Sequence, residues 1–113
     1  MRKTLECRKI ELYCDFHGHS RQKDTFMYGC TSTGQQPVHH VDKRFKEQVF
    51  PQMYDQICPN FSFSGSSFTV HKSKESTGRV VMWKEFSLTN SYTCEASFCG
   101  PSQGEYKGFH YNI

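Results

Sequence analysis

The segment Ser91 to Cys99 (SYTCEASFC) restricts the fold most, because apolar and polar residues alternate along it. Successive side chains of a β-strand point to opposite faces of a sheet. The alternation therefore predicts a strand with an apolar and a polar face, ended by Gly100 and Pro101. The apolar face would hold Tyr92, Cys94, Ala96 and Phe98, and the polar face Ser91, Thr93, Glu95 and Ser97.

The stretch from Asp42 to Ile57 carries the strongest helical pattern in the chain. Apolar residues recur there at every fourth position, at Phe45, Val49, Met53 and Ile57. Asp42 can cap the amino end of this helix, because its carboxylate can accept hydrogen bonds from free backbone N–H groups. Pro51 lacks a backbone N–H, so it predicts a kink or a division into two helices.

Short apolar runs between glycine- and serine-rich segments predict further strands. Ile10 to Phe16 would form a buried strand that ends just before His17. The other predicted strands are Thr25 to Tyr28, Phe61 to Phe63 and Phe68 to His71, with loops at Thr31 to Pro37 and Lys72 to Gly78. Arg79 to Phe86 fits either a strand or one or two helical turns. Strands interleaved with a helix predict an α/β fold, in which ligands bind at the carboxyl ends of strands.

Length and composition exclude several classes of protein. A chain of 113 residues forms at most one small domain, and it holds no run of about 20 apolar residues that could span a membrane. The amino end shows no secretion signal, so the six cysteines predict reduced thiols in a cytoplasmic protein, with a secreted disulfide-linked domain as the alternative. A net charge of +3 does not indicate nucleic-acid binding but is compatible with an acidic peptide partner.

The densest chemistry in the chain lies in Asp15 to Ser20 (DFHGHS), directly after the first predicted strand. A neutral imidazole at a strand end is a good zinc ligand, and Gly18 would allow a sharp turn or the close approach of a ligand. The alternative is a strand exit in which His17 and His19 only hydrogen-bond to the backbone. A second candidate is Glu95, a carboxylate within an otherwise packed strand, where burial costs desolvation unless the group is paired or used. Alternatively, Glu95 faces solvent or pairs with Lys84.

Three segments resemble, in the same order, the cytosolic carboxypeptidase branch of the zinc carboxypeptidases, the tubulin deglutamylases. They are YCDFHGHSRQKDTFMYGC (Tyr13 to Cys30), HKSKESTGRVVMWKEF (His71 to Phe86) and NSYTCEASFCG (Asn90 to Gly100). The similarity covers most of Ile10 to Tyr111 and is weakest around Thr31 to His40. It implies that residues 1–113 are the C-terminal portion of a catalytic domain, and thus a partial three-layer zinc-carboxypeptidase-like α/β domain with a mixed β-sheet.

The resemblance also implies roles for particular residues. His17 would be one ligand of a single Zn²⁺ ion, and Glu95 the general base that acts on the zinc-bound water. Selectivity for acidic chain ends, such as those of polyglutamylated tubulin, would need a cation in the pocket. Arg79, in the TGRVVMW string, is the first candidate because arginine can hold a carboxylate with two hydrogen bonds, and Lys74 is the second.

This sequence departs from the family pattern in one important respect. The His-x-x-Glu pair that supplies two further zinc ligands in the family is absent. We therefore expect the 113-residue chain to be an incomplete domain that is inactive by itself, derived from an enzyme that hydrolyses C-terminal or side-chain glutamates. The alternative is a non-catalytic remnant or binding module for acidic protein tails.

Overall fold

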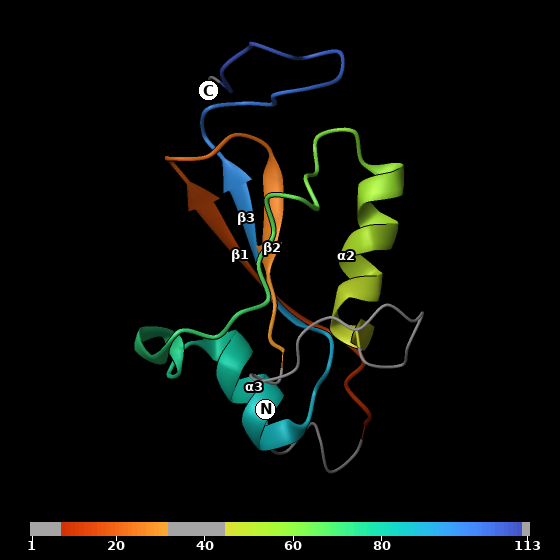
Figure 1. Cartoon of the computed structure of the whole chain (residues 1–113), viewed down its shortest axis with the longest axis vertical. Coiled ribbons are helices and arrows are strands. Elements are labelled where there is room, and N and C mark those ends of the chain that lie inside the picture. The colour runs from red at the N-terminus through yellow and green to blue at the C-terminus, as the bar shows by residue number, and fades with distance from the viewer. Residues whose placement is uncertain (1–7, 32–44, 112–113) are drawn as a thin grey trace.

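The described part of the chain is a small α/β unit built on a mixed three-stranded sheet. A computed structural model describes residues 8–31 and 45–111. Its elements, in chain order, are β1 (Tyr13–His19), β2 (Thr25–Tyr28), α2 (Lys46–Ile57), the 3-10 helix η2 (Lys72–Lys74), α3 (Gly78–Phe86) and β3 (Ser91–Ser97). The strand order is β1-β3-β2, with β1 parallel and β2 antiparallel to β3 (Figure 1). The predicted α/β fold and mixed sheet are confirmed.

The hydrophobic core lies between α2 and one face of the sheet. Met27, Phe61, Tyr92 and Cys94 form its buried centre. The ring of Phe50, from α2, stacks on that of Tyr92 with 5.6 Å between centroids. Tyr92 and Cys94 belong to the apolar face predicted for Ser91 to Cys99, but Ala96 and Phe98, assigned to the same face, are exposed, and the strand itself spans Ser91–Ser97.

The opposite, polar face of β3 is buried as well. Ser91, Thr93, Glu95 and Ser97 all have less than a tenth of their surface exposed. Helix α3 lies against the amino-terminal end of this face, where the Ser91 hydroxyl donates to the Arg79 carbonyl at 2.7 Å. The central strand therefore carries polar side chains into a region that both the sheet and a helix shield from water.

The first strand differs from its prediction. It was expected to be buried over Ile10 to Phe16 and to end before His17, but β1 runs from Tyr13 to His19 and contains His17. Among the described residues β1 pairs only with β3, so it forms an edge of the sheet, and Phe16 is 77% exposed. An apolar run indicates a strand but does not reveal how many neighbours that strand has.

The secondary structure of the remaining segments agrees with the predictions only in part. Arg79 to Phe86 is helical, as part of α3. The strands predicted at Phe61 to Phe63 and Phe68 to His71 are wrong, because only single bridges, Thr25 to Phe61 and Tyr28 to Ser67, form there. The chain bends there instead, since the hydroxyl of Ser62, within the first of these runs, accepts from the Gly65 N–H. The proposed cap Asp42 and the loop from Thr31 to Pro37 lie outside the described residues, except for Thr31.

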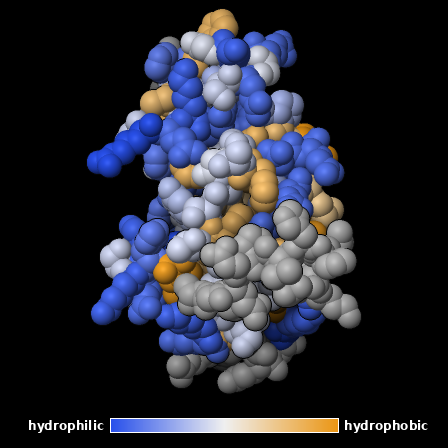
Figure 2. Space-filling model, in the orientation of Figure 1, coloured by the Kyte–Doolittle hydropathy of each residue, from blue (hydrophilic) through white to orange (hydrophobic). Residues whose placement is uncertain are grey.

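The face of the molecule seen in Figure 2 is mainly hydrophilic, and the described helices and cysteines show neither a membrane span nor a disulfide bond. In the view of Figure 2, hydrophilic side chains predominate and apolar ones are scattered among them. Within residues 8–31 and 45–111, neither helix combines the length and apolar character needed to cross a bilayer. Cys14, Cys30, Cys58, Cys94 and Cys99 are all free thiols.

Helix α2 continues through Pro51 because a residue of β3 compensates for the missing donor. In a helix, the N–H of residue 51 would donate to the carbonyl of Glu47, and proline has no N–H to give. The Tyr92 hydroxyl instead donates to the Glu47 carbonyl at 2.8 Å. Burial, and next the Glu47 carboxylate, raise the pKa of Tyr92, so the hydroxyl keeps its proton. The predicted division of the helix is therefore wrong, and the packed β-sheet is the reason.

Replacing Tyr92 with Phe should lower the free energy of unfolding, although the substitution removes only one oxygen atom. The ring and its packing remain, but the Glu47 carbonyl loses its donor inside the core. A buried unsatisfied carbonyl costs about 1–3 kcal/mol. Urea unfolding followed by circular dichroism measures this loss, with Tyr106→Phe, at an exposed tyrosine, as the control. Equal midpoints for the two variants would contradict this account of α2.

Candidate active site

A cavity of about 420 Å³ opens on the polar face of the sheet. It is lined by residues of β1, β2 and β3 and of the segment from η2 to α3. All four predicted site residues, His17, Lys74, Arg79 and Glu95, line it. A larger groove of about 1010 Å³, between α2 and the segment before β1, contains none of them. The smaller cavity is therefore the candidate site, because it brings together imidazole, carboxylate and guanidinium groups.

His17 and Glu95 are neighbours across the sheet. They are paired in the parallel register of β1 and β3, which places both side chains on the same face. Glu95 is only 9% exposed, and no described cation lies within ion-pair distance of it. Lys84 pairs instead with Glu75, at 3.2 Å. The alternative in which Glu95 faces solvent or pairs with Lys84 is therefore wrong.

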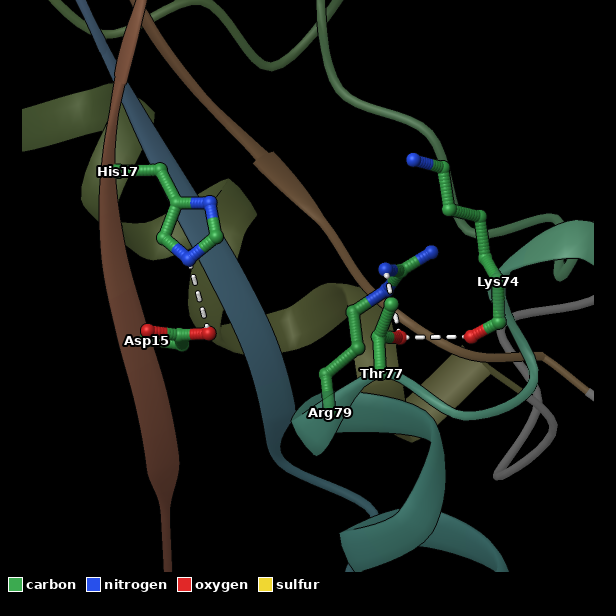
Figure 3. Close-up of polar contacts among 5 residues, drawn as sticks. All are labelled: Asp15, His17, Lys74, Thr77 and Arg79. Carbon is green, nitrogen blue, oxygen red and sulfur yellow. Dashed lines mark hydrogen bonds and ion pairs between the residues drawn. The ribbon is translucent and has the colours of Figure 1, made fainter.

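His17 is oriented by an acidic neighbour on its own strand. Its Nε2 lies 3.0 Å from Oδ2 of Asp15, two residues earlier on the same face (Figure 3). Metal-binding histidines commonly donate one ring N–H to a carboxylate, which leaves the other nitrogen as the ligand. Here that other atom is Nδ1, on a side chain that is 52% exposed and lines the cavity.

His19 and Gly18 have structural roles. Nδ1 of His19 accepts hydrogen bonds from the backbone N–H groups of Arg21 and Gln22, at 3.2 and 3.1 Å. This is the backbone-bonded alternative considered for the two histidines, and it holds for His19. Gly18 lies inside β1, and the ring of Phe98 fills the space that a Cβ would take. The predicted turn or ligand approach at Gly18 is therefore wrong.

Arg79 is a buried cation fixed at several points. It is 6% exposed; its Nε donates to the Gly29 carbonyl at 3.3 Å, and its Nη1 donates to the Thr77 hydroxyl at 3.4 Å. The guanidinium carbon lies 5.6 Å from the centre of the Tyr28 ring, a cation–π distance. No described carboxylate pairs with it. A buried guanidinium without an acidic partner is costly, which favours a site that receives an anion.

Lys74 differs from Arg79 in being exposed. It belongs to η2, whose residues are all at the surface, and its ammonium forms no ion pair with a described carboxylate. Figure 3 shows its side chain on the same side of the site as the Arg79 guanidinium. A solvated lysine at this position can attract an acidic ligand but fixes no geometry.

The described residues fit one part of a zinc site. They contain no group of three or more metal-ligating side chains. They do contain an imidazole whose second nitrogen is held by a carboxylate, which is the arrangement typical of one zinc ligand. His17 therefore fits a single position in the coordination shell, and the other ligands would come from elsewhere.

Three contributors to the site were not found from the sequence. Tyr28 and Gly29 contact Arg79 from about 50 positions earlier in the chain, and Thr77 contacts it from two residues away. Neither Tyr28 nor Gly29 carries a local pattern that identifies it. Thr77 belongs to the predicted loop from Lys72 to Gly78, so its position at the start of α3 was not visible.

Comparisons with known proteins identify relatives along almost the whole chain. No family model matches it. It is 45% identical over 113 residues to "Cytosolic carboxypeptidase 3" of Bos taurus, aligning 99% of this chain with 11% of that protein. It is 44% identical over 114 residues to "Cytosolic carboxypeptidase 2" of Mus musculus, covering 100% of this chain and 12% of that protein. For "Cytosolic carboxypeptidase 1" of Xenopus laevis the identity is 46% over 105 residues, covering 85% and 8%.

The chain thus spans only 8–12% of the length of these three relatives. The similarity nevertheless extends through β1, α3 and β3, the elements that carry His17, Arg79 and Glu95. With identities of 44–46% over 85–100% of its length, the chain belongs to the cytosolic carboxypeptidase family.

Proposed function

We propose that this chain is the C-terminal portion of the catalytic domain of a cytoplasmic zinc carboxypeptidase that removes glutamate from acidic protein tails, such as those of polyglutamylated tubulin. One observation carries the proposal. His17, Arg79 and Glu95 come from three separate elements and line a single cavity. In the complete enzyme this unit would form part of a three-layer domain, whose other segments would supply the remaining zinc ligands.

His17 would hold the metal through Nδ1, and Asp15 would fix the orientation of the ring. When bound, zinc supplies Lewis-acid polarisation and lowers the pKa of water. The edge strand β1 presents the imidazole to the cavity from one side. The role of Asp15 is to position the ring, because its carboxylate is already engaged with His17.

Glu95 would act as the general base. Its carboxylate has no competing cation among the described residues and lies on the central strand, next to His17. A base in this position can accept a proton from the attacking water and return it to the leaving amine. The rigidity of a strand paired on both sides keeps the carboxylate in place during both transfers.

Arg79 would bind the side-chain carboxylate of the substrate's terminal glutamate. It is buried, already fixed, and has guanidinium N–H groups that donate to no described residue. A bidentate pair with a carboxylate distinguishes glutamate from glutamine by charge as well as by shape. Lys74, at the surface, would increase the rate at which acidic tails arrive.

The test is to place this segment in a complete relative. We would insert residues 8–111 of this chain into mouse cytosolic carboxypeptidase 2 in place of the segment that aligns with them. The resulting chimera would be assayed with peptides that end in glutamate or glutamine. We expect glutamate release that a chelator abolishes and Zn²⁺ restores, with at least about tenfold preference for the glutamate peptide. A folded chimera that releases glutamine as readily as glutamate would contradict the proposed specificity. A folded chimera that releases neither would contradict the proposed catalysis.

A second candidate function is a binding module for acidic tails. The observation in its favour is that Arg79 and its surroundings need no metal to receive a carboxylate. This function predicts that the 113-residue chain binds glutamate-rich peptides in the presence of a chelator. It is favoured over catalysis if that binding occurs while the folded chimera is inactive.

A further inference from the structure

Hydrogen bonds to both the backbone and the side chain of Arg79 fix the position of its guanidinium. The backbone at Arg79 is fixed through its carbonyl, which accepts from the Ser91 hydroxyl at 2.7 Å and from the Cys30 thiol at 3.8 Å. Burial raises the pKa of the Cys30 thiol, which therefore remains protonated and able to donate. The side chain is then held at Nε by the Gly29 carbonyl and at Nη1 by the Thr77 hydroxyl.

The Thr77 hydroxyl has a fixed polarity. It donates its single hydrogen to the Lys74 carbonyl at 2.7 Å, so towards Arg79 it can only accept. Figure 3 shows this relay from the backbone of Lys74 through Thr77 to the guanidinium. The turn formed by η2 thereby determines which way the hydroxyl lone pairs point, and these in turn determine where Nη1 lies.

Thr77 occupies a helix start without using its hydroxyl there. It is the N-cap residue of α3, where a threonine hydroxyl ordinarily accepts from a backbone N–H of the first turn. No such side-chain bond forms. A residue that departs from a local rule in this way is often serving a site instead.

The contacts leave one side of the guanidinium available. A guanidinium has five N–H groups, and the contacts with Gly29 and Thr77 use two of them. The others donate to no described residue, and Arg79 lines the cavity that also contains Glu95. Since the Nε contact fixes one edge of the plane, the Nη1 contact decides whether the free N–H groups face the cavity as a pair.

We propose that Thr77 is a positioning residue that orients the Arg79 guanidinium for bidentate binding of a ligand carboxylate. This rests on the proposed function of Arg79 and extends it to a residue that contacts the ligand only through Arg79. Loss of the hydroxyl leaves the cation in the cavity but frees it to rotate, so the pairing with a planar carboxylate is weakened. A ligand whose side chain ends in a neutral amide gains little from the bidentate geometry at Arg79 and is affected less.

The variants Thr77→Val and Thr77→Ser test this in the full chain. Valine keeps the shape and removes the hydroxyl, whereas serine keeps the hydroxyl. The Lys74 carbonyl still accepts from the Thr77 backbone N–H at 3.0 Å, and no cap bond is lost, so Thr77→Val should unfold within a few degrees of the parent chain. The probes are N-acetylglutamate and N-acetylglutamine, each with its α-carboxyl group blocked as an amide so that only the side chains differ, titrated by NMR.

We expect Thr77→Val to bind N-acetylglutamate about tenfold more weakly, with N-acetylglutamine changed less than about twofold, and Thr77→Ser to restore the parent affinity. A second readout does not need the ligand. A guanidinium held at Nη1 gives separate Nη signals, and in Thr77→Val rotation about the Nε–Cζ bond should merge them.

The outcomes separate the two proposals. Equal ligand selectivity and equal Arg79 signals in the parent chain and Thr77→Val would overturn the role of Thr77 while leaving that of Arg79 intact. If the parent chain does not distinguish the two ligands, the specificity proposed for Arg79 is wrong. Unmerged Nη signals in Thr77→Val would also overturn the role of Thr77, independently of ligand binding. Weaker binding that Thr77→Ser does not restore would attribute the effect to shape rather than to the hydroxyl.

Discussion

Replacing Glu95 with Gln in the chimeric carboxypeptidase is expected to lower kcat by about 10²–10⁴-fold while KM stays within a factor of about three. The amide has the size and shape of the carboxylate, so the buried position on β3 can accommodate it. It cannot accept the proton of an attacking water. Steady-state assays of glutamate release at saturating substrate measure the change directly.

The control for Glu95 is Glu85→Gln, on the exposed side of α3 and outside the cavity. It removes the same charge and should leave kcat within about twofold of the parent chimera. A Glu95→Gln chimera that binds zinc and keeps more than a tenth of its kcat would refute the role of general base.

Arg79→Met should remove most of the preference for acidic ends. Methionine fills the space over the Tyr28 ring but carries no charge and no donors. Hydrogen bonds to a charged group contribute about 1.5–3 kcal/mol, so kcat/KM for the glutamate peptide should fall about 10–150-fold. The glutamine peptide should change less than about threefold, and the ratio of the two kcat/KM values is the measurement.

The matched control for Arg79 is Lys74→Met, which removes the exposed cation near the site. It should lower kcat/KM for the glutamate peptide only at low salt, because a solvated charge acts at long range and is screened. If Lys74→Met changed the glutamate preference as much as Arg79→Met at high salt, the specificity would reside in Lys74 instead.

The central strand was predictable because its pattern is local. Alternation in Ser91 to Cys99 identified β3 and placed Glu95 on its polar face. The burial of that face was not predictable, since it depends on α3 and on residues of β1 and β2 that are distant in the sequence. Polar residues in an alternating strand ordinarily face water, but here all four on this face are buried, and Thr93 and Glu95 line the cavity.

For helix α2, the sequence pattern predicted that a helix forms but not which of its sides is buried. The four-residue spacing correctly indicated a helix, but Val49, Met53 and Ile57 are exposed and the helix packs through Phe50 and Tyr54. Periodicity shows that a helix forms and leaves open which side meets the sheet. The same holds for Pro51, whose effect depends on a tyrosine that lies 41 positions later in the chain.

The candidate site was predictable mainly through family resemblance. From the residues alone, His17 was either a ligand or a backbone-bonded histidine, and Glu95 was either a base or a surface carboxylate. The structure places both in one cavity, together with Arg79 and Lys74. The contacts of Arg79 with Tyr28 and Gly29 could not be predicted, because they arise only when β2 and α3 meet.

His17 and Glu95, which we propose act together, lie on two strands, β1 and β3, that differ in local stability. Opening β1 breaks one ladder of backbone hydrogen bonds in the described sheet, whereas opening β3 breaks two. Strand edges open at lower free energy than central strands, so fluctuations would release His17 while Glu95 stays in place. If His17 holds the metal as proposed, loss of metal would then precede global unfolding as the first step of heat inactivation. A segment that pairs with the edge of β1 left unpaired among the described residues would slow both steps.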